Sequence, residues 1–168
     1  EMCIRDRVGF VRPAGPRPGR PLENAAALLA DGRIAAVHVK TLLPTYDVFD
    51  ETRYFRPGPE PAVMTVAGRR LGVSICEDLW DPDALGRRLY ETDPIARLRE
   101  AGAEVIVNIS ASPFQVGKVA LREQLIARQA RRTGAVIVYV NQVGGNDELV
   151  FDGFSTAVSP DGSMLGRA

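Results

Sequence analysis

The stretch "GVSICEDLW", residues Gly72 to Trp80, ends an apolar run in a cysteine and follows it at once with two acids. The apolar residues before Cys76 predict a strand, and the acids Glu77 and Asp78 predict the turn that ends it. The thiol would then stand at a strand end, where side chains from several segments converge. A lone cysteine behind an apolar run is more often a small buried hydrophobic residue, so its position alone does not make it a nucleophile.

Two β-hairpins are predicted on the N-terminal side of this cysteine. Residues 24–30 and 33–40 flank an Asp31-Gly32 pair, and residues 62–76 form two apolar runs with Gly68 between them. Both patterns predict hairpins, because these turn residues accept the positive φ that a tight turn requires.

Strands and helices alternate on the C-terminal side. Helices are predicted over residues 93–101, with Pro94 in the first turn, and over 119–134, where apolar residues recur at helical spacing. Residues 103–110 and 135–145 are apolar and rich in β-branched side chains, as in strands covered on both faces. This order predicts an α/β fold, a mixed sheet with helices on its outer faces.

Composition limits the class of protein. The chain has 168 residues, 45% of them hydrophobic, with 21 basic and 21 acidic side chains, so it is long enough for one good core and gives no electrostatic reason to expect nucleic acid or an anionic membrane as partner. Its two cysteines, Cys3 and Cys76, lie far apart and lack neighbouring ligands for a metal, which indicates a reducing cytoplasm. No apolar run has the length of a membrane span.

The two ends of the chain look atypical. Residues 1–7 are interpreted as a non-native or truncated start, and the whole Pro/Gly/Arg-rich stretch 1–21 is expected to be poorly ordered. The domain proper is therefore predicted over residues 22–168. The last residues read as a strand, a Pro-Asp-Gly turn and a further strand with no closing element, which indicates a piece of something larger.

Three other predicted strands also end in polar residues. They lead into "KTLLPTYDVFDE" from Lys40, "NISASPFQVGK" from Asn108 and "YVNQVGGNDELVFDG" from Tyr139. Each has a structural interpretation beside a functional one: Lys40 as a solvated strand end, the aromatic residues as packing groups, and Ser110 and Ser112 as residues that terminate a strand.

Together these motifs resemble the carbon-nitrogen hydrolase (nitrilase) superfamily, and more narrowly the glutaminase domains of glutamine-dependent NAD(+) synthetases. The resemblance implies a nitrilase-like α-β-β-α sandwich, truncated at both ends. It implies Cys76 as the nucleophile, Lys40 as the lysine of a Glu-Lys-Cys triad, and Glu51 as an acid beside the triad. For the substrate glutamine, it implies contacts from Tyr46, Ser112 and Lys118.

The chemistry of amide hydrolysis is consistent with these assignments. A thiolate beside a lysine ammonium is stabilised by the positive charge. Attack on an amide places negative charge on the carbonyl oxygen, which Lys40 and the backbone N–H of Glu77 are expected to stabilise. A glutamate base is also needed to take the thiol proton. In the family this base lies well upstream of the lysine, in a segment resembling Phe-Pro-Glu-Leu that this chain lacks, so the isolated chain is predicted to be an impaired or inactive glutaminase.

The resemblance also implies partners. The parent enzyme would pass ammonia to a C-terminal synthetase domain that uses ATP and Mg²⁺ to amidate nicotinic acid adenine dinucleotide, whereas this chain itself would hold no cofactor and no metal. The intact protein would be a homo-oligomer. Two alternatives stay open: a stand-alone amidase of the same superfamily, and a non-catalytic interaction module.

Overall fold

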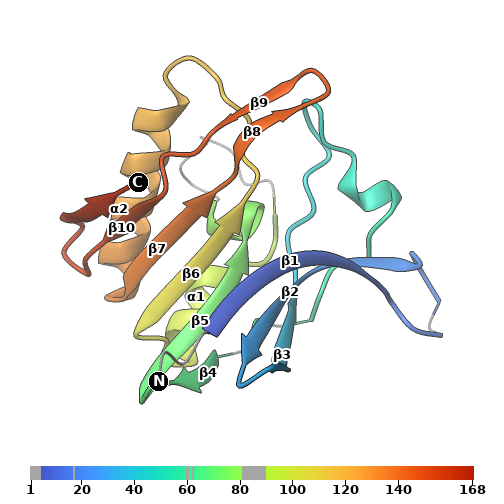
Figure 1. Cartoon of the computed structure of the whole chain (residues 1–168), viewed down its shortest axis with the longest axis horizontal. Coiled ribbons are helices and arrows are strands. Elements are labelled where there is room, and N and C mark those ends of the chain that lie inside the picture. Colours follow the sequence, from blue (N-terminus) through green and yellow to red (C-terminus); the bar gives the residue numbers. More distant parts are fainter. Residues whose placement is uncertain (1–4, 17, 60, 62, 81–89) are drawn as a thin grey trace.

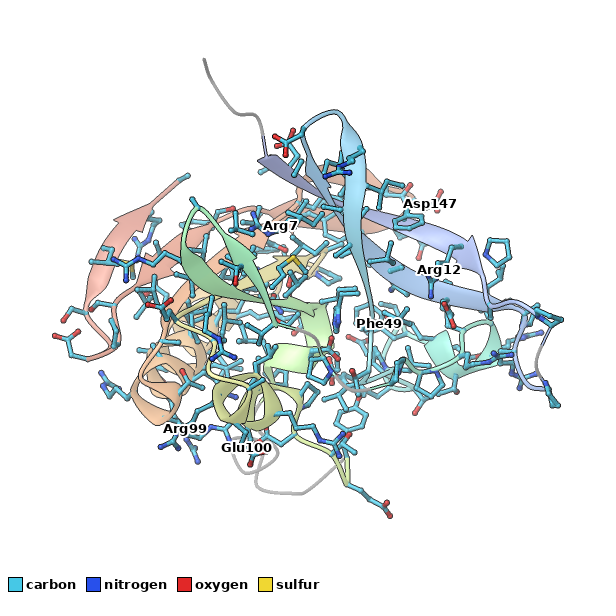
Figure 2. The ribbon with its side chains drawn as sticks, turned by 90° about the horizontal axis from the view of Figure 1, so that it is seen from below. Arg7, Arg12, Phe49, Arg99, Glu100 and Asp147 are labelled. Atoms are coloured by element: carbon cyan, nitrogen blue, oxygen red, sulfur yellow. The ribbon has the colours of Figure 1, made fainter. Side chains whose placement is uncertain are left out.

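Two β-sheets stack face to face, and two helices cover one side of the stack (Figure 1). The computed structural model describes residues 5–16, 18–59, 61, 63–80 and 90–168. In the view of Figure 2 the helices, the larger sheet and the smaller sheet follow one another as three layers. Of the four layers of the expected α-β-β-α sandwich, these residues form the sequence α-β-β.

The larger sheet has six strands in the order β11-β10-β7-β6-β5-β4. Its central strands β5, β6 and β7 run parallel, whereas β4, β10 and β11 pair antiparallel with their neighbours. The strands are β4 (Val63–Val66), β5 (Arg69–Ile75), β6 (Val105–Ser110), β7 (Val136–Asn141), β10 (Thr156–Val158) and β11 (Met164–Arg167). The predicted mixed sheet is confirmed, including the strand–turn–strand pattern at the C-terminal end.

The smaller sheet has three antiparallel strands, β1 (Arg5–Pro13), β2 (Leu22–Ala30) and β3 (Arg33–Val39). Asp31 and Gly32 both have positive φ between β2 and β3, as predicted for this hairpin. Strand β1 differs from the sequence expectation, which placed poorly ordered chain over residues 1–21. Its backbone is ordered by antiparallel pairing with β2 along its whole length, which the Pro/Gly/Arg-rich composition did not indicate. Residues 1–4, with Cys3, lie outside the described residues.

The helices α1 (Pro94–Glu100) and α2 (Lys118–Thr133) pack on the larger sheet near the positions predicted for them. The side chain of Asp93 caps α1 by accepting a hydrogen bond from the Ala96 amide. A core of buried residues joins the helices to the sheet, including Ile95, Leu98, Ile106, Ile126 and Ile137. A Cβ added at Gly72 of β5 would lie 2.9 Å from Leu98 Cδ2, so this glycine lets α1 approach the sheet closely.

A second core lies between the two sheets and contains Ala26, Leu71, Val73, Ile75 and Val107. Strand β6 contributes side chains to both cores, because Ile106 faces the helices and Val107 faces the smaller sheet. This two-sided burial explains its continuous apolar sequence.

A third, two-stranded sheet extends beyond the layers as the hairpin β8 (Val143–Asn146) and β9 (Leu149–Asp152) (Figure 1). From the sequence, residues 135–145 were predicted as one strand, whereas β7 ends at Asn141 and β8 begins at Val143. The exposed, glycine-containing strand β8 lacks the alternation of apolar and polar residues that signals a strand.

Candidate active site

Cys76 lies in a sharp turn at the end of β5. The strand stops at Ile75, and Cys76 begins the short 3-10 helix η2 (Cys76–Leu79) with a φ of +44°. A non-glycine residue in this left-handed region is strained, and such residues persist where the surrounding structure holds them in place. Cys76 is half-buried and borders two cavities with room for a ligand.

The first cavity, here called the Lys40 cavity, has a volume of about 360 Å³ and is lined by Lys40, Glu51, Cys76 and Ser110 among others. Lys40 follows β3 and is 1% exposed, and its Nζ lies 2.5 Å from Glu51 Oε1. Glu51 begins the 3-10 helix η1 (Glu51–Arg53) and also accepts a 3.4 Å hydrogen bond from Asn24. A buried ammonium needs such a carboxylate partner, and the pair fixes Lys40 at the wall of the cavity that Cys76 shares.

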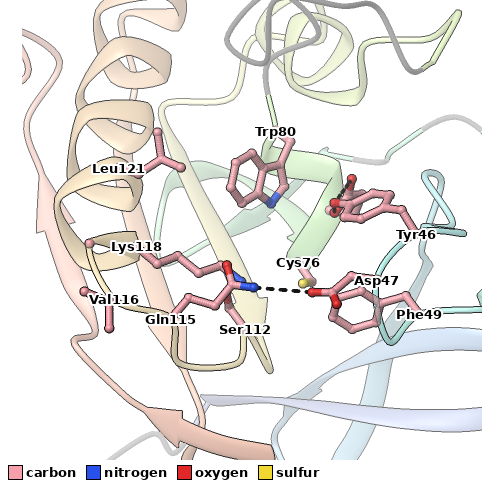
Figure 3. Close-up of a pocket in the computed structure, with 12 residues that line it drawn as sticks. Tyr46, Asp47, Phe49, Cys76, Trp80, Ser112, Gln115, Val116, Lys118 and Leu121 are labelled. Carbon is pink, nitrogen blue, oxygen red and sulfur yellow. Dashed lines mark hydrogen bonds between the residues drawn. The ribbon is translucent and has the colours of Figure 1, made fainter.

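The second cavity, here called the Lys118 cavity, has a volume of about 420 Å³ and is shown in Figure 3. Four of the other predicted site residues line it together with Cys76: Tyr46, Glu77, Ser112 and Lys118. Trp80, Phe49 and Leu121 add apolar surface. A hydrogen bond of 3.4 Å from Gln115 to Asp47 links the two sides of the cavity (Figure 3). The volume falls within the range of small-molecule sites, roughly 300–1,000 Å³.

Glu77 presents a buried carboxylate beside this cavity. The hydroxyl of Tyr46 donates to its two oxygens at 2.7 and 2.8 Å, and the hydroxyl of Tyr90 donates to Oε1 at 2.9 Å. Burial raises the pKa of Glu77 although these hydrogen bonds and Lys40 oppose the rise. Burial and the Glu77 carboxylate together raise the pKa of both tyrosines, so their hydroxyls stay protonated and available as donors.

Ser112 is held by a buried amide. Asn141 at the end of β7 accepts the Ser112 N–H at 2.8 Å and donates to the Ser112 carbonyl at 3.3 Å. Asn141 also donates to Asp152, which pairs with the buried guanidinium of Arg122 at 2.6 Å. This network ties the loop after β6 to α2 and β9, and so fixes one wall of the Lys118 cavity.

The surroundings of the thiol act on its pKa in opposite directions. Burial raises the pKa of Cys76, and the carboxylates of Glu77 and Glu51 raise it further, whereas the charge of Lys40 and a hydrogen bond with Ser110 lower it. Burial also lowers the pKa of Lys118, against the opposite influence of Cys76. Both lysines therefore interact electrostatically with the same sulfur.

The structure brings the six other site residues singled out from the sequence together around Cys76. It adds residues that the sequence did not single out, among them Asp78, Trp80 and Gln115. Trp80 and Gln115 stand in motifs that were recognised, but only the fold shows that they face a cavity. Asn141 could be noticed from the sequence, because it is an amide at the end of a predicted apolar strand.

Two absences concern the described part of the chain. Within it, no group of three or more His, Cys, Asp or Glu residues is placed to hold a metal ion. Neither α1 nor α2 combines the length and apolar character needed to cross a membrane.

Comparisons with known proteins agree on one family. The family model described as carbon-nitrogen hydrolase matches residues 8–168. The glutamine-dependent NAD(+) synthetase of Synechocystis sp. is 45% identical over 165 residues, which cover 96% of this chain and 30% of that protein. The solved structure of the glutamine-dependent NAD+ synthetase from Acinetobacter baumannii, in complex with ADP, matches with a TM-score of 0.86 and 35% identity over 98% of this chain and 29% of its own.

An amidase from Nesterenkonia sp. AN1 in complex with butyramide shares the fold, with a TM-score of 0.77 and 24% identity over 96% of this chain and 57% of its own. The chain spans less than a third of the length of the two NAD synthetases. The match over nearly all of its residues, together with the layered fold and the cysteine turn, shows that the chain belongs to the carbon-nitrogen hydrolase family.

Proposed function

We propose that this chain is part of the glutamine-hydrolysing domain of a glutamine-dependent NAD(+) synthetase, with Cys76 as its nucleophile. The observation that carries the proposal is the position of Cys76 between two cavities, with Lys40 in one and the oppositely charged Glu77 and Lys118 in the other. The names of the related proteins support the choice of glutamine.

The reaction would proceed through a thioester. Cys76 Sγ attacks the side-chain amide carbon of glutamine, the C–N bond breaks, and ammonia leaves with the proton lost by the thiol. Water then adds to the thioester carbon, which releases glutamate and restores the thiol. During both steps negative charge develops on the carbonyl oxygen, and Lys40 with the Glu77 backbone N–H would stabilise it. Glu51 would hold Lys40 in place for this role.

The Lys118 cavity fits the zwitterionic end of an amino acid. Lys118 supplies a positive charge for the α-carboxylate, and the buried Glu77 carboxylate supplies a negative one for the α-ammonium. Tyr46 and Ser112 add hydroxyl groups that exchange hydrogen bonds with either group. The two charges stand on different elements, Glu77 on η2 and Lys118 on α2. The cavity would therefore select ligands that carry both an ammonium and a carboxylate group.

In the longer protein, the ammonia would pass to a synthetase domain that uses ATP and Mg²⁺, as the name of the related synthetase and its ADP complex suggest. We also propose that the protein is cytoplasmic and homo-oligomeric. This part of the chain would need no cofactor or metal. A stand-alone amidase would need no charged pair in the Lys118 cavity, and a non-catalytic module would need no reactive thiol.

Alkylation of Cys76 by iodoacetamide, followed at this residue by mass spectrometry, tests the proposal. Glutamine is expected to protect Cys76 from alkylation in a saturable manner. The variant Lys118→Met is expected to weaken this protection at least about tenfold, the loss for one charged contact. The same variant should leave protection by butyramide, which lacks the carboxylate, unchanged.

The matched control is Arg99→Gln, which removes a positive charge from the exposed face of α1 (Figure 2). It should leave glutamine protection intact. Equal protection by glutamine and butyramide in the unaltered chain would favour the stand-alone amidase, and no protection by either would favour the non-catalytic module.

A further inference from the structure

One buried carboxylate contacts the segments of both Lys40 and Cys76. Asp78 is 0% exposed and lies in η2, two residues after Cys76. Its Oδ1 accepts the backbone N–H groups of Thr41 at 3.0 Å and Leu42 at 2.8 Å, the two residues that directly follow Lys40. Its Oδ2 accepts the N–H of Ile75, the residue directly before Cys76, at 3.1 Å.

From this geometry we infer that Asp78 is a positioning residue that holds Lys40 and Cys76 in register across the Lys40 cavity. The inference rests on the proposed function, since it concerns the same site. Asp78 does not line either cavity with them and would not touch substrate, so it acts through the two residues that it places.

The contact with Ile75 also supports the strained turn. By accepting the Ile75 amide, Asp78 closes the turn in which Cys76 adopts its φ of +44°. A left-handed non-glycine residue is strained and needs such fixed neighbours. The same side chain therefore aims the thiol and anchors the chain beyond the lysine.

A carboxylate suits this position because these three backbone partners are all donors. Thr41, Leu42 and Ile75 each offer an N–H, and an ionised Asp has acceptors alone to present to them. His38 Nε2 also lies 3.5 Å from Asp78 Oδ2. An asparagine would keep the size but turn an NH₂ group towards at least one of the amides, which would break the link on one side.

The pH dependence of thiol alkylation separates positioning from a direct charge effect. The groups that act on the Cys76 thiol are Lys40, Glu77, Glu51 and Ser110, and it interacts in turn with Lys118, Tyr46 and Tyr139. Removal of the negative charge of Asp78 would by itself favour the thiolate and lower the thiol pKa. Loss of positioning would instead move Lys40 away from the sulfur and raise the thiol pKa. The two effects on the thiol pKa therefore have opposite signs.

The test measures the alkylation rate of Cys76 against pH in the full 168-residue chain and in Asp78→Asn. We expect the rate at pH 7.5 to fall about tenfold in the variant and the profile to move up by about one pH unit, since one unit corresponds to a tenfold change in thiolate. A profile that stays in place or moves down would overturn the inference. No glutamine is present, so the proposed function can fail, by loss of glutamine protection, without affecting this result.

Asp93→Asn serves as the control, because Asp93 also accepts a backbone amide and pairs with Arg132 but lies outside both cavities. It should lower thermal stability without moving the alkylation profile. If Asp78→Asn does not fold, amide hydrogen exchange in the unaltered chain decides. Slow exchange of the Thr41, Leu42 and Ile75 amides supports the inference, and fast exchange of Thr41 and Leu42 contradicts it.

Discussion

The burial of Lys40 excludes one of the two interpretations that its sequence allowed, that of a solvated strand end. A lysine at a strand end is commonly solvated, yet this side chain is 1% exposed and pairs with Glu51 at the wall of a cavity that also holds the Cys76 thiol. Burial of a charge is costly unless the charge is paired. Lys40 at this position therefore loses hydration that a lysine at an ordinary strand end would keep. This supports the proposal that its charge acts on the thiol.

The first prediction concerns this charge. Because Lys40 lowers the thiol pKa, Lys40→Met should raise it and slow alkylation of Cys76 at pH 7.5 by about tenfold. The rate is measured by mass spectrometry at Cys76, with circular dichroism to confirm folding. The exposed charge variant Arg99→Gln should react like the unaltered chain. Equal or faster alkylation of Lys40→Met would show that the ammonium does not stabilise the thiolate.

At this scale the sequence indicated the residues that are proposed to carry the chemistry, and Glu51 beside Lys40, but not the contacts made by Asp78. Cys76, Lys40 and Lys118 stood in recognisable motifs. Asp78 was visible only as a turn-forming acid, because its partners Thr41 and Leu42 lie 37 and 36 residues away along the chain. Contacts of this range depend on the packing of the two sheets, which local sequence does not specify.

At the scale of elements, local chemistry determined which ones could be predicted. The hairpins at Asp31-Gly32 and Ala67-Gly68 have positive φ at both turn residues, and Asp31, Gly32 and Gly68 signal these turns in the sequence. Strand β1 and the β8–β9 hairpin lack such signals and form through pairing with neighbouring strands. Buried strands and helices were predictable because the two cores impose apolar patterns on them.

The second prediction concerns the start of α1. Burial alone would raise the pKa of Asp93, but hydrogen bonds from Arg132 and the Ala96 amide outweigh it and hold the pKa below its usual range. A lowered folded-state pKa adds stability above the unfolded value, and this stability is lost as pH falls through the folded value. Asp93→Asn should therefore cost about 1 kcal/mol at pH 7, as for a partly exposed ion pair, and progressively less below pH 3.8.

Urea denaturation at pH 7 and at pH 3 measures this difference. The exposed variant Asp50→Asn should change the free energy of unfolding by less than about 0.5 kcal/mol at either pH. A cost of Asp93→Asn that stays constant or grows on acidification would contradict the assignment of the lowered pKa.

At the scale of the whole molecule, the two cavities beside Cys76 offer few candidates for the general base of the proposed reaction. In the described residues, the carboxylates that line the two cavities are Asp47, Glu51 and Glu77. Glu51 is paired with Lys40, Glu77 accepts from two tyrosines, and Asp47 accepts from Gln115. Glu51 holds Lys40, Glu77 is proposed to bind the substrate ammonium, and Asp47 faces Gln115, so the proposed reaction assigns none of them to the thiol proton.

The third prediction follows from this arrangement. General-base catalysis contributes about 10²- to 10⁴-fold to such reactions, so the 168-residue chain should release ammonia from glutamine at least about a hundredfold more slowly than the longer Synechocystis relative. Ammonia is measured for both proteins at saturating glutamine, with Cys76→Ala as the blank. Turnover within about tenfold of the relative, abolished in Cys76→Ala, would mean that Glu51 or Glu77 leaves its partner and acts as the base. Glu51→Gln and Glu77→Gln would then identify which one, because the acting carboxylate is the one whose amide variant loses turnover even at saturating glutamine.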